Sequence, residues 1–221
     1  MKLTLVKTAD RGKLSALVFI DCNGLVQLAT IAADGMRLEI KELAGVEKVE
    51  DLWISDDGTI RVLTIDGSVR SYSEEMEQWA LDFTISGKGE DMFTHILPLS
   101  TPSFYLAVSY SYSTHSSTLY LVDQSTNTST PVYTLEGNEY PLKTLCKLDA
   151  DTNRVLLVKH MKEVCLFDVD ISKRTGRMDR VIQVGNSELC GVERLEDGRI
   201  VVFGEECLKV LDFRASEEMG G

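Results

Sequence analysis

The sequence has few of the residues that build metal and redox centres. Its three histidines, His95, His115 and His160, fall in unrelated stretches of the chain. Its five cysteines are widely spaced, and no two of them form a Cys-x-x-Cys pair. Such a set suits neither a disulfide framework nor a zinc site. We therefore expect reduced cysteines, mostly buried as small apolar side chains, and neither a metal ion nor another cofactor.

Long apolar runs are also missing. A membrane-spanning helix needs about 18 or more consecutive apolar residues, and no segment approaches that length. The first residues, MKLTLVKTADRGK, contain no apolar core of the kind that a secretory signal requires. We therefore expect an intracellular protein, cytoplasmic or nuclear, that has no membrane partner.

Basic side chains are outnumbered by acidic ones. The chain of 221 residues has 23 Lys and Arg against 35 Asp and Glu, which gives a formal net charge of −12. This charge repels nucleic acid and anionic lipid at long range, so we expect no direct contact with nucleic acid. The acidic clusters are typical of a solvated surface, and the alternative is a surface that steers a basic partner.

The sequence does contain a repeated alternation of apolar and polar residues. Short runs rich in Val, Ile, Leu, Thr and Tyr recur along the whole chain, separated by Asp-Gly, Asn-Gly and Ser/Thr clusters. Alternation of this kind predicts β-strands, and the Asp-Gly pairs predict hairpin turns. The best helical candidate, residues 73–79, is one turn at most. The expected fold class is therefore all-β.

Five segments of the chain share the same order of strands and turns. In each segment a strand that ends at a turn precedes two further strands, and these first turns lie 34 to 51 residues apart. The first turns are at Gly24, Gly58, Pro102, Asn153 and Gly198. A fourth strand follows in at least three segments, as QWALDFTIS, STPVYTLEG and MDRVIQVG. Repeats of about 40–45 residues with four strands each are typical of β-propeller blades.

The repeats predict one domain, a β-propeller of about five four-stranded blades over residues 1–215, followed by a polar tail at residues 216–221. Two arrangements are open. In the first, the strand Lys2–Lys7 supplies the missing fourth strand of the last blade and closes the ring. In the second, the chain is part of a larger propeller that a partner completes. We favour closure within the chain, because an unclosed propeller exposes long strand edges.

The pattern resembles a divergent WD-repeat β-propeller. Three of the third strands end in an apolar residue followed by Asp, where that family places Trp-Asp; the pairs are Val122-Asp123, Phe167-Asp168 and Leu211-Asp212. The turns at residues 56–58 and 196–198 resemble the family's Asp-Gly turn. The resemblance covers most of the chain, and it implies a platform on which other proteins assemble.

The expected function is therefore non-catalytic: a protein–protein interaction scaffold and subunit of a multiprotein assembly, with no small-molecule ligand. The sequence has no nucleophile, phosphate-binding or metalloprotease motif. The alternative is a five-bladed glycoside hydrolase or a sugar-binding lectin. Glycoside hydrolysis needs two carboxyl groups about 5–10 Å apart. The candidates at the blade mouths are Glu50, Asp51, Glu188 and Glu193.

Two groups of residues are candidates for binding a partner protein. The basic group has four positive charges within eight residues and consists of Lys173, Arg174, Arg177 and Arg180. We expect it to dock an acidic protein segment, because a nucleic-acid site would need a longer stretch with interleaved aromatics. The aromatic group, Tyr110 and Tyr112, lies in a unit that holds five of the seven tyrosines. These two side chains belong either to the core or to a binding hot spot.

Deletion of residues 1–8 tests closure of the ring. If Lys2–Lys7 pairs with the strand near residues 207–213, its loss removes a ladder of hydrogen bonds and exposes a strand edge. One such strand contributes several kcal/mol, a large part of a domain's net stability of about 5–15 kcal/mol. We expect this variant to unfold or aggregate, whereas removal of residues 216–221 leaves the protein soluble. A truncated monomer with unchanged melting would contradict closure within the chain.

Overall fold

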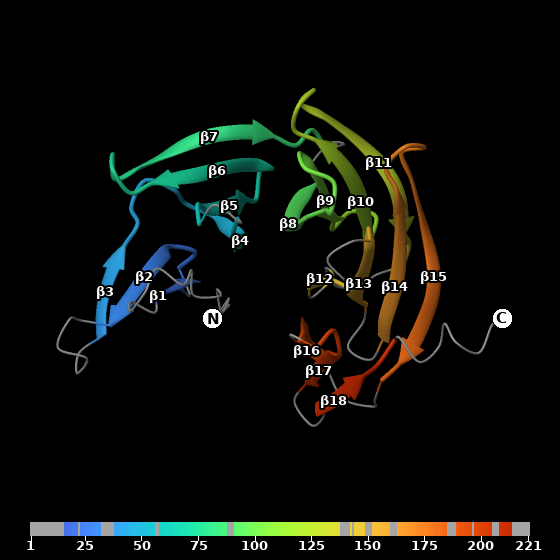
Figure 1. The fold of residues 1–221 in the computed structure, drawn as a ribbon. Helices are drawn as coiled ribbons and strands as arrows, with labels where there is room; N and C mark the ends of the chain where they lie inside the picture. The colour runs from blue at the N-terminus through green and yellow to red at the C-terminus, as the bar shows by residue number, and fades with distance from the viewer. Residues whose placement is uncertain are drawn as a thin grey trace. The chain divides into compact units, whose positions relative to one another are not determined.

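The computed structural model describes the greater part of the chain, and its regular structure is β-strand throughout (Figure 1). The described residues are 16–21, 23–31, 38–55, 58–87, 91–137, 142, 144–148, 152–159, 163–184, 189–195, 197–204 and 208–213. Among these residues there is no helix, and residues 74–77 form a turn between two strands. The prediction of an all-β fold is confirmed.

The strands form five antiparallel sheets, in each of which the spatial order follows the chain order. The chain is a five-bladed β-propeller whose blades have three or four strands, as the repeats predicted. Blade 1 consists of β1 (Ala16–Ile20), β2 (Val26–Ile31) and β3 (Leu38–Glu42). Blade 2 consists of β4 (Val49–Ile54), β5 (Ile60–Thr64), β6 (Ser68–Ser73) and β7 (Gln78–Thr84).

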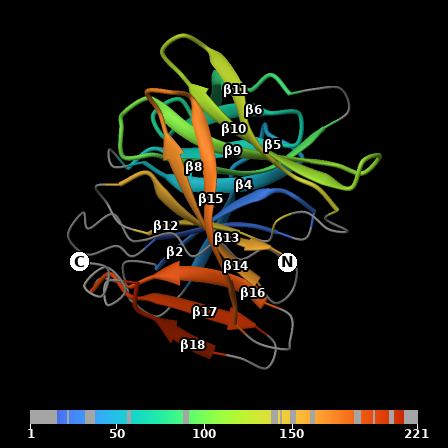
Figure 2. The same cartoon turned by 90° about the vertical axis from the view of Figure 1, so that its right-hand side faces the viewer.

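The remaining three blades follow the same plan. Blade 3 consists of β8 (Met92–Pro98), β9 (Phe104–Ser111), β10 (Ser116–Asp123) and β11 (Thr128–Leu135). Blade 4 consists of β12 (Leu145–Lys147), β13 (Arg154–Lys159), β14 (Glu163–Asp170) and β15 (Thr175–Gln183). Blade 5 consists of β16 (Leu189–Arg194), β17 (Ile200–Gly204) and β18 (Leu208–Leu211), which lie side by side in Figures 1 and 2. The three predicted fourth strands are β7, β11 and β15.

The chain divides into two compact units. Unit 1 comprises residues 1–87 and 92–94 and contains blades 1 and 2, whereas unit 2 comprises residues 88–91 and 95–221 and contains most of blade 3 with blades 4 and 5. The predicted closing strand, Lys2–Lys7, and the predicted tail at residues 216–221 lie outside the described residues. Closure of the ring therefore stays a prediction.

Gly58 and Gly198 lie in hairpin turns, as the sequence predicted. The amide of Gly58 donates to the carbonyl of Ser55 at 2.8 Å, and the amide of Gly198 donates to the carbonyl of Leu195 at 3.0 Å. Both glycines have a positive φ, 81° and 83°, which residues with a Cβ rarely adopt. The glycine is therefore what allows the first and second strands of blades 2 and 5 to meet in so short a turn.

A second kind of turn joins the third and fourth strands. In these four-residue turns the last residue has a positive φ, as at Asn127 and Arg174. In blade 3 the strand before the turn ends in Asp123, which accepts hydrogen bonds from the amide and hydroxyl of Ser125. In blade 4 this acid is Asp170, so the predicted Phe167-Asp168 pair lies two residues before the end of β14. Only short polar side chains reach back to the backbone in this way.

The second and third strands of blades 3 and 4 are buried on both faces. One apolar cluster of unit 2 joins blade 3 to blade 4, and a second cluster joins blade 4 to blade 5. The sequence shows this two-sided burial directly, because β13 reads RVLLVK and β14 reads EVCLFDVD with few polar interruptions. In unit 1 a third cluster joins blades 1 and 2, and the Trp79 indole nitrogen donates to the carbonyl of Leu43 at 3.1 Å.

The described cysteines are free thiols, as predicted. Cys146 and Cys165 are buried and Cys190 is exposed. Burial raises the pKa of the Cys146 thiol to about 12 and that of Cys165 to about 11, so both are protonated at neutral pH. Cys22 and Cys207 lie outside the described residues, as does His160.

Gly176 is required by the close approach of an aromatic ring. The buried ring of Phe167 rests on Gly176 of the neighbouring strand, and a Cβ at position 176 would lie 2.2 Å from the ring Cζ. The same ring meets Tyr133 of blade 3 at a centroid distance of 5.4 Å and an interplanar angle of 69°. A side chain at position 176 would therefore displace the ring that joins blades 3 and 4.

Substitution of Gly176 by alanine should destabilise the protein. We expect G176A to lower the free energy of unfolding by about 1–3 kcal/mol, the usual cost of an overpacked core. Because F167L removes the collision, the double variant F167L/G176A should lose less than the sum of the two single losses. Urea denaturation of the four proteins measures this coupling. Additive losses would show that the Phe167 ring does not rest on Gly176.

Candidate partner-binding surfaces

Tyr112 lies exposed in the β9–β10 turn of blade 3. Its side chain is 60% exposed, whereas that of Tyr110 is fully buried. The two rings meet edge to face, with 4.8 Å between centroids and 89° between planes. The Tyr110 hydroxyl lies 3.5 Å from Nδ1 of His115. Of the two predicted tyrosines, only Tyr112 is exposed enough to contact a partner. The buried ring of Tyr110 packs against the Tyr112 ring and supports it.

Two of the predicted basic residues lie in the β14–β15 turn. The Lys173 ammonium is 3.0 Å from the Asp170 carboxylate. Hydrogen bonds from the Ser172 hydroxyl and the Lys173 amide hold the pKa of Asp170 well below its usual range. Arg174 reaches across to blade 3, where its Nη2 is 3.4 Å from Oδ2 of Asp123. Both positive charges of this turn are therefore matched by a carboxylate.

Arg177 belongs to a network of charges on blade 4. Its Nη2 lies 3.1 Å from Oδ2 of Asp168, whose other oxygen accepts a 2.9 Å hydrogen bond from Nε of Arg154. Asp179 adds a second carboxylate, 3.5 Å from Arg154 and 3.8 Å from Arg177. Arg180 lies on the same strand, β15, with its side chain exposed.

Three of the four predicted basic residues are therefore paired with carboxylates. Lys173 pairs with an acid three residues away in the chain, whereas the acid that pairs with Arg174 is 51 positions away. The pairing of β14 with β15 brings Asp168 to Arg177, and the packing of blade 4 on blade 3 brings Asp123 to Arg174. A local pattern in the sequence could not have shown the pair between Arg174 and Asp123.

Tyr112 and the Asp123–Arg174 pair lie at opposite ends of strand β10 of blade 3. This strand begins at Ser116, beside the turn that holds Tyr112, and ends at Asp123, which pairs with Arg174. A strand rises about 3.3 Å per residue, so its eight residues separate Tyr112 from Arg174 by about 25 Å. Tyr112 and the turn that holds Lys173 and Arg174 therefore belong to separate surfaces.

Three of the four carboxylates of the alternative enzyme hypothesis lie in the part of the chain that the structure describes. Glu50 and Asp51 are neighbours on β4 of unit 1, and Glu193 lies on β16 of unit 2. Glu188 lies outside the described residues. Within the described ranges, no three His, Cys, Asp or Glu side chains are grouped as a metal site requires. No helix in that part of the chain is long and apolar enough to cross a membrane.

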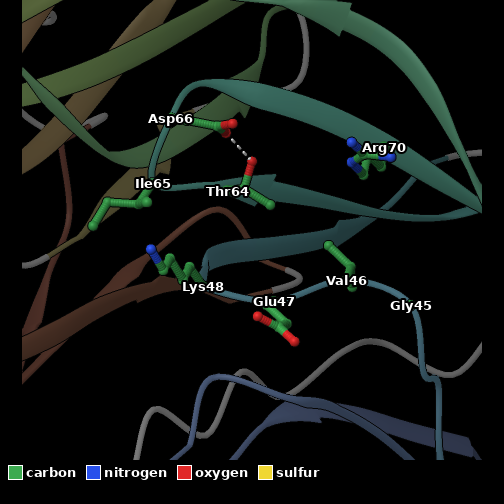
Figure 3. Close-up of a pocket in the computed structure, with 8 residues that line it drawn as sticks. All are labelled: Gly45, Val46, Glu47, Lys48, Thr64, Ile65, Asp66 and Arg70. Carbon is green, nitrogen blue, oxygen red and sulfur yellow. Dashed lines mark hydrogen bonds between the residues drawn. The ribbon is translucent and has the colours of Figure 1, made fainter.

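A shallow hollow in unit 1 has a volume of about 250 Å³ (Figure 3). It lies between the β3–β4 connection and the β5–β6 turn, and its lining includes Lys48, Thr64, Asp66 and Arg70. The Thr64 hydroxyl donates to the Asp66 carboxylate, which also accepts from the Ser68 amide at 3.1 Å. The Thr64 hydrogen bond is the main reason that the pKa of Asp66 is lowered. Asp66 thus stabilises its own turn.

Sequence reasoning missed the exposed apolar side chains of blade 5. Phe203, Leu208 and Val210 are all substantially exposed on β17 and β18. The sequence did contain a sign of them, because β17 reads IVVFG and β18 reads LKVL, which places apolar residues on both faces of this sheet. The sequence alone could not show that one of these faces is left uncovered.

No family model and no curated protein sequence matches this chain. Its fold does recur in solved structures. A protein from Lactobacillus plantarum matches 94% of this chain with a TM-score of 0.66 at 12% sequence identity. A chain in the crystal structure of a mitotic checkpoint complex matches 89% with a TM-score of 0.61 at 11% identity.

Identities this low show a shared β-propeller fold alone. Both solved chains are longer than the part that is matched, since the alignment covers 67% of the first and 59% of the second. This chain therefore spans about two thirds or less of the length of the propellers it resembles.

The charge network of blade 4 can be tested at its central acid. In D168N a neutral side chain faces both Arg154 and Arg177, so we expect a loss of about 1–2 kcal/mol in the free energy of unfolding. Arg177 is 75% exposed, and its removal in R177Q should cost less than about 0.5 kcal/mol. Urea denaturation at low and high salt measures both. Equal effects of the two variants would show that Asp168 does not organise the network.

Proposed function

We propose that this chain is a non-catalytic interaction module, a WD-repeat-like propeller that binds other proteins as a subunit of an intracellular assembly. The proposal includes no cofactor and no direct contact with nucleic acid or membrane. Its partners bind at the ends of the blades, where turns project side chains that the strands hold in place.

The observation that carries this proposal is the geometry of Tyr112. An aromatic side chain that is 60% exposed offers a large contact area. Its edge-to-face contact with the buried Tyr110 restricts the ring before any partner binds. Restriction of this kind lowers the entropic cost of association, and tyrosine is among the residues enriched at binding hot spots. An exposed, supported ring of this kind is expected of a protein-binding surface.

The charge network of blade 4 supports a second contact with a partner. Lys173 and Arg177 are paired with carboxylates and yet keep exposed side chains, at 77% and 75%. An acidic segment of a partner can therefore compete for these cations without breaking a buried ion pair. Such a contact would fix the orientation of the partner more than it would raise affinity.

One similar solved structure supports the subunit role by analogy. It is a chain of a mitotic checkpoint complex, and so an example of this fold within a multiprotein assembly. Because this likeness concerns the fold, the proposal for this chain depends on its own residues.

Substitution of Tyr112 by alanine tests the proposal. Affinity purification from the native cell should recover at least about tenfold less of the partner with Y112A, because a hot-spot residue contributes about 2 kcal/mol or more. Y112F keeps the ring and should retain the partner. M76A is the control, since Met76 is 61% exposed in a turn of another blade, the β6–β7 turn of blade 2.

The melting temperatures of all three variants should stay within about 2 °C of the wild type, because the substituted side chains are exposed. Partners retained in full by Y112A would contradict binding at this turn. Turnover of chromogenic glycosides by the purified chain would contradict the non-catalytic function.

A further inference from the structure

Within unit 2, the faces that join neighbouring blades have a common composition. On the side of blade 3 that meets blade 4, strands β9 and β10 supply two cross-strand pairs of buried aliphatic side chains. These pairs are Leu106 with Leu121 and Val108 with Leu119. On the side of blade 4 that meets blade 5, strands β13 and β14 supply two such pairs again, Leu156 with Leu166 and Val158 with Val164. All eight side chains are buried.

Blade 5 has two pairs of this kind on its outer side, and three of their four side chains are exposed while Val201 is half-buried. Val201 pairs with Val210, and Phe203 pairs with Leu208. Leu208 is 73% exposed, Val210 51% and Phe203 41%. The opposite face of the sheet carries Ile200 and Val202, which are buried against blade 4. We call the four residues Val201, Phe203, Leu208 and Val210 the open face.

The open face is ordered by its own sheet. The Phe203 ring lies over Gly191 of β16, where an added Cβ would be 2.5 Å from the ring Cζ. Blade 4 has the same arrangement, since the ring of Phe167 rests on Gly176. There the ring is in contact with Tyr133 of blade 3. Phe203 is therefore positioned like a ring in a blade interface, although its side chain is 41% exposed.

The edge of blade 5 also lacks the protection that exposed strands usually have. β18 pairs only with β17 among the described strands, so one of its edges is unpaired there. Proteins commonly guard such an edge with a charged side chain. The only charged residue of β18 is Lys209, and its ammonium is hydrogen-bonded to the carbonyl of Val184 on the opposite side of the sheet. No charged side chain on β18 is therefore placed to prevent another apolar sheet from approaching blade 5.

We propose that the open face binds a β-sheet of propeller-blade type that a partner polypeptide supplies, which is the second of the two arrangements that the sequence leaves open and replaces closure within the chain. The partner's sheet presents aliphatic side chains to the open face, as blade 4 does to blade 5. Glu193 is exposed on the same face beside Val201, so the partner carries a Lys or Arg opposite it. Association with a second copy is disfavoured, because it would bring together two chains of charge −12.

The lengths of the similar solved propellers are consistent with a further sheet beside blade 5. Both continue beyond the part that matches this chain, so five sheets of this kind occur together with further chain in one fold. The proposal shares with the proposed function only the premise that the partner is a protein. It uses a different surface, so the Tyr112 variants do not decide it.

The first test compares L208E/V210E with L81E in the full chain. Leu81 is 56% exposed on β7, which makes L81E a matched control. With bis-ANS as the probe, L208E/V210E should reduce dye fluorescence at least about threefold while L81E changes it little, because the dye binds contiguous apolar surface. The melting temperature should shift by less than about 2 °C, as for exposed positions. Light scattering should show a monomer in all three proteins.

Other results would overturn the proposal. A fall in the melting temperature of more than about 5 °C in L208E/V210E, with a rise in dye binding, would show that residues of this chain cover the open face. A wild-type dimer that L208E/V210E separates would assign the face to a second copy.

The second test places a benzophenone amino acid at position 208, and at position 81 as a control, in the native cell. We expect a cross-link from position 208 alone, to a segment of another polypeptide with alternating apolar residues. That polypeptide, once purified and added to the full chain, should slow hydrogen exchange of the β17 and β18 amides at least about tenfold, because sheet burial protects them. A cross-link confined to this chain, or none at all, or no protection, would overturn the proposal even if Tyr112 proves to bind a partner.

Discussion

Contact between the apolar faces of neighbouring sheets is the interaction on which each unit depends. A three- or four-stranded sheet of short strands cannot bury enough surface alone, so each blade is stable only when another sheet covers it. In unit 2 this contact is made twice, through side chains such as Phe167 and Leu156 that are fully buried. The turns, charge pairs and exposed tyrosine are all held in place by these packed faces.

The same constraint explains why polar groups gather at the ends and outer edges of the blades. Strands buried on both faces leave no room for charge, as the burial of β13 and β14 shows. In blade 4 the charges therefore lie toward the ends of β13 and β14 and on the outermost strand, β15, where Arg154, Asp168 and Arg177 form their network. Their partial exposure makes these ion pairs weak contributors to stability, and it leaves them free to exchange partners on binding.

Blade 5 differs from blades 3 and 4 in the exposure of its outer face. One face of its sheet is packed on blade 4, and the other carries the exposed apolar side chains of Phe203, Leu208 and Val210. Contiguous exposed apolar side chains are typical of interaction sites. The open face and the supported ring of Tyr112 independently support the proposal that this propeller binds partner proteins.

The sequence by itself determined the fold class, the number of blades and the positions of the turns. Alternating apolar residues form strands, and residues such as Gly58 and Gly198 form turns, through interactions with their neighbours in the chain. These elements can therefore be recognised without the tertiary structure. The free state of Cys146 and Cys165 followed from their spacing in the same way.

Only the tertiary structure decided which candidate residues are available to a partner. Tyr110 and Tyr112 are two residues apart and of one type, yet the packing of blade 3 buries the first and exposes the second. Arg174 is one of four clustered basic residues in the sequence, and its charge is matched by Asp123 from another blade. Burial and charge pairing depend on contacts between residues far apart in the chain. A local pattern cannot contain that information.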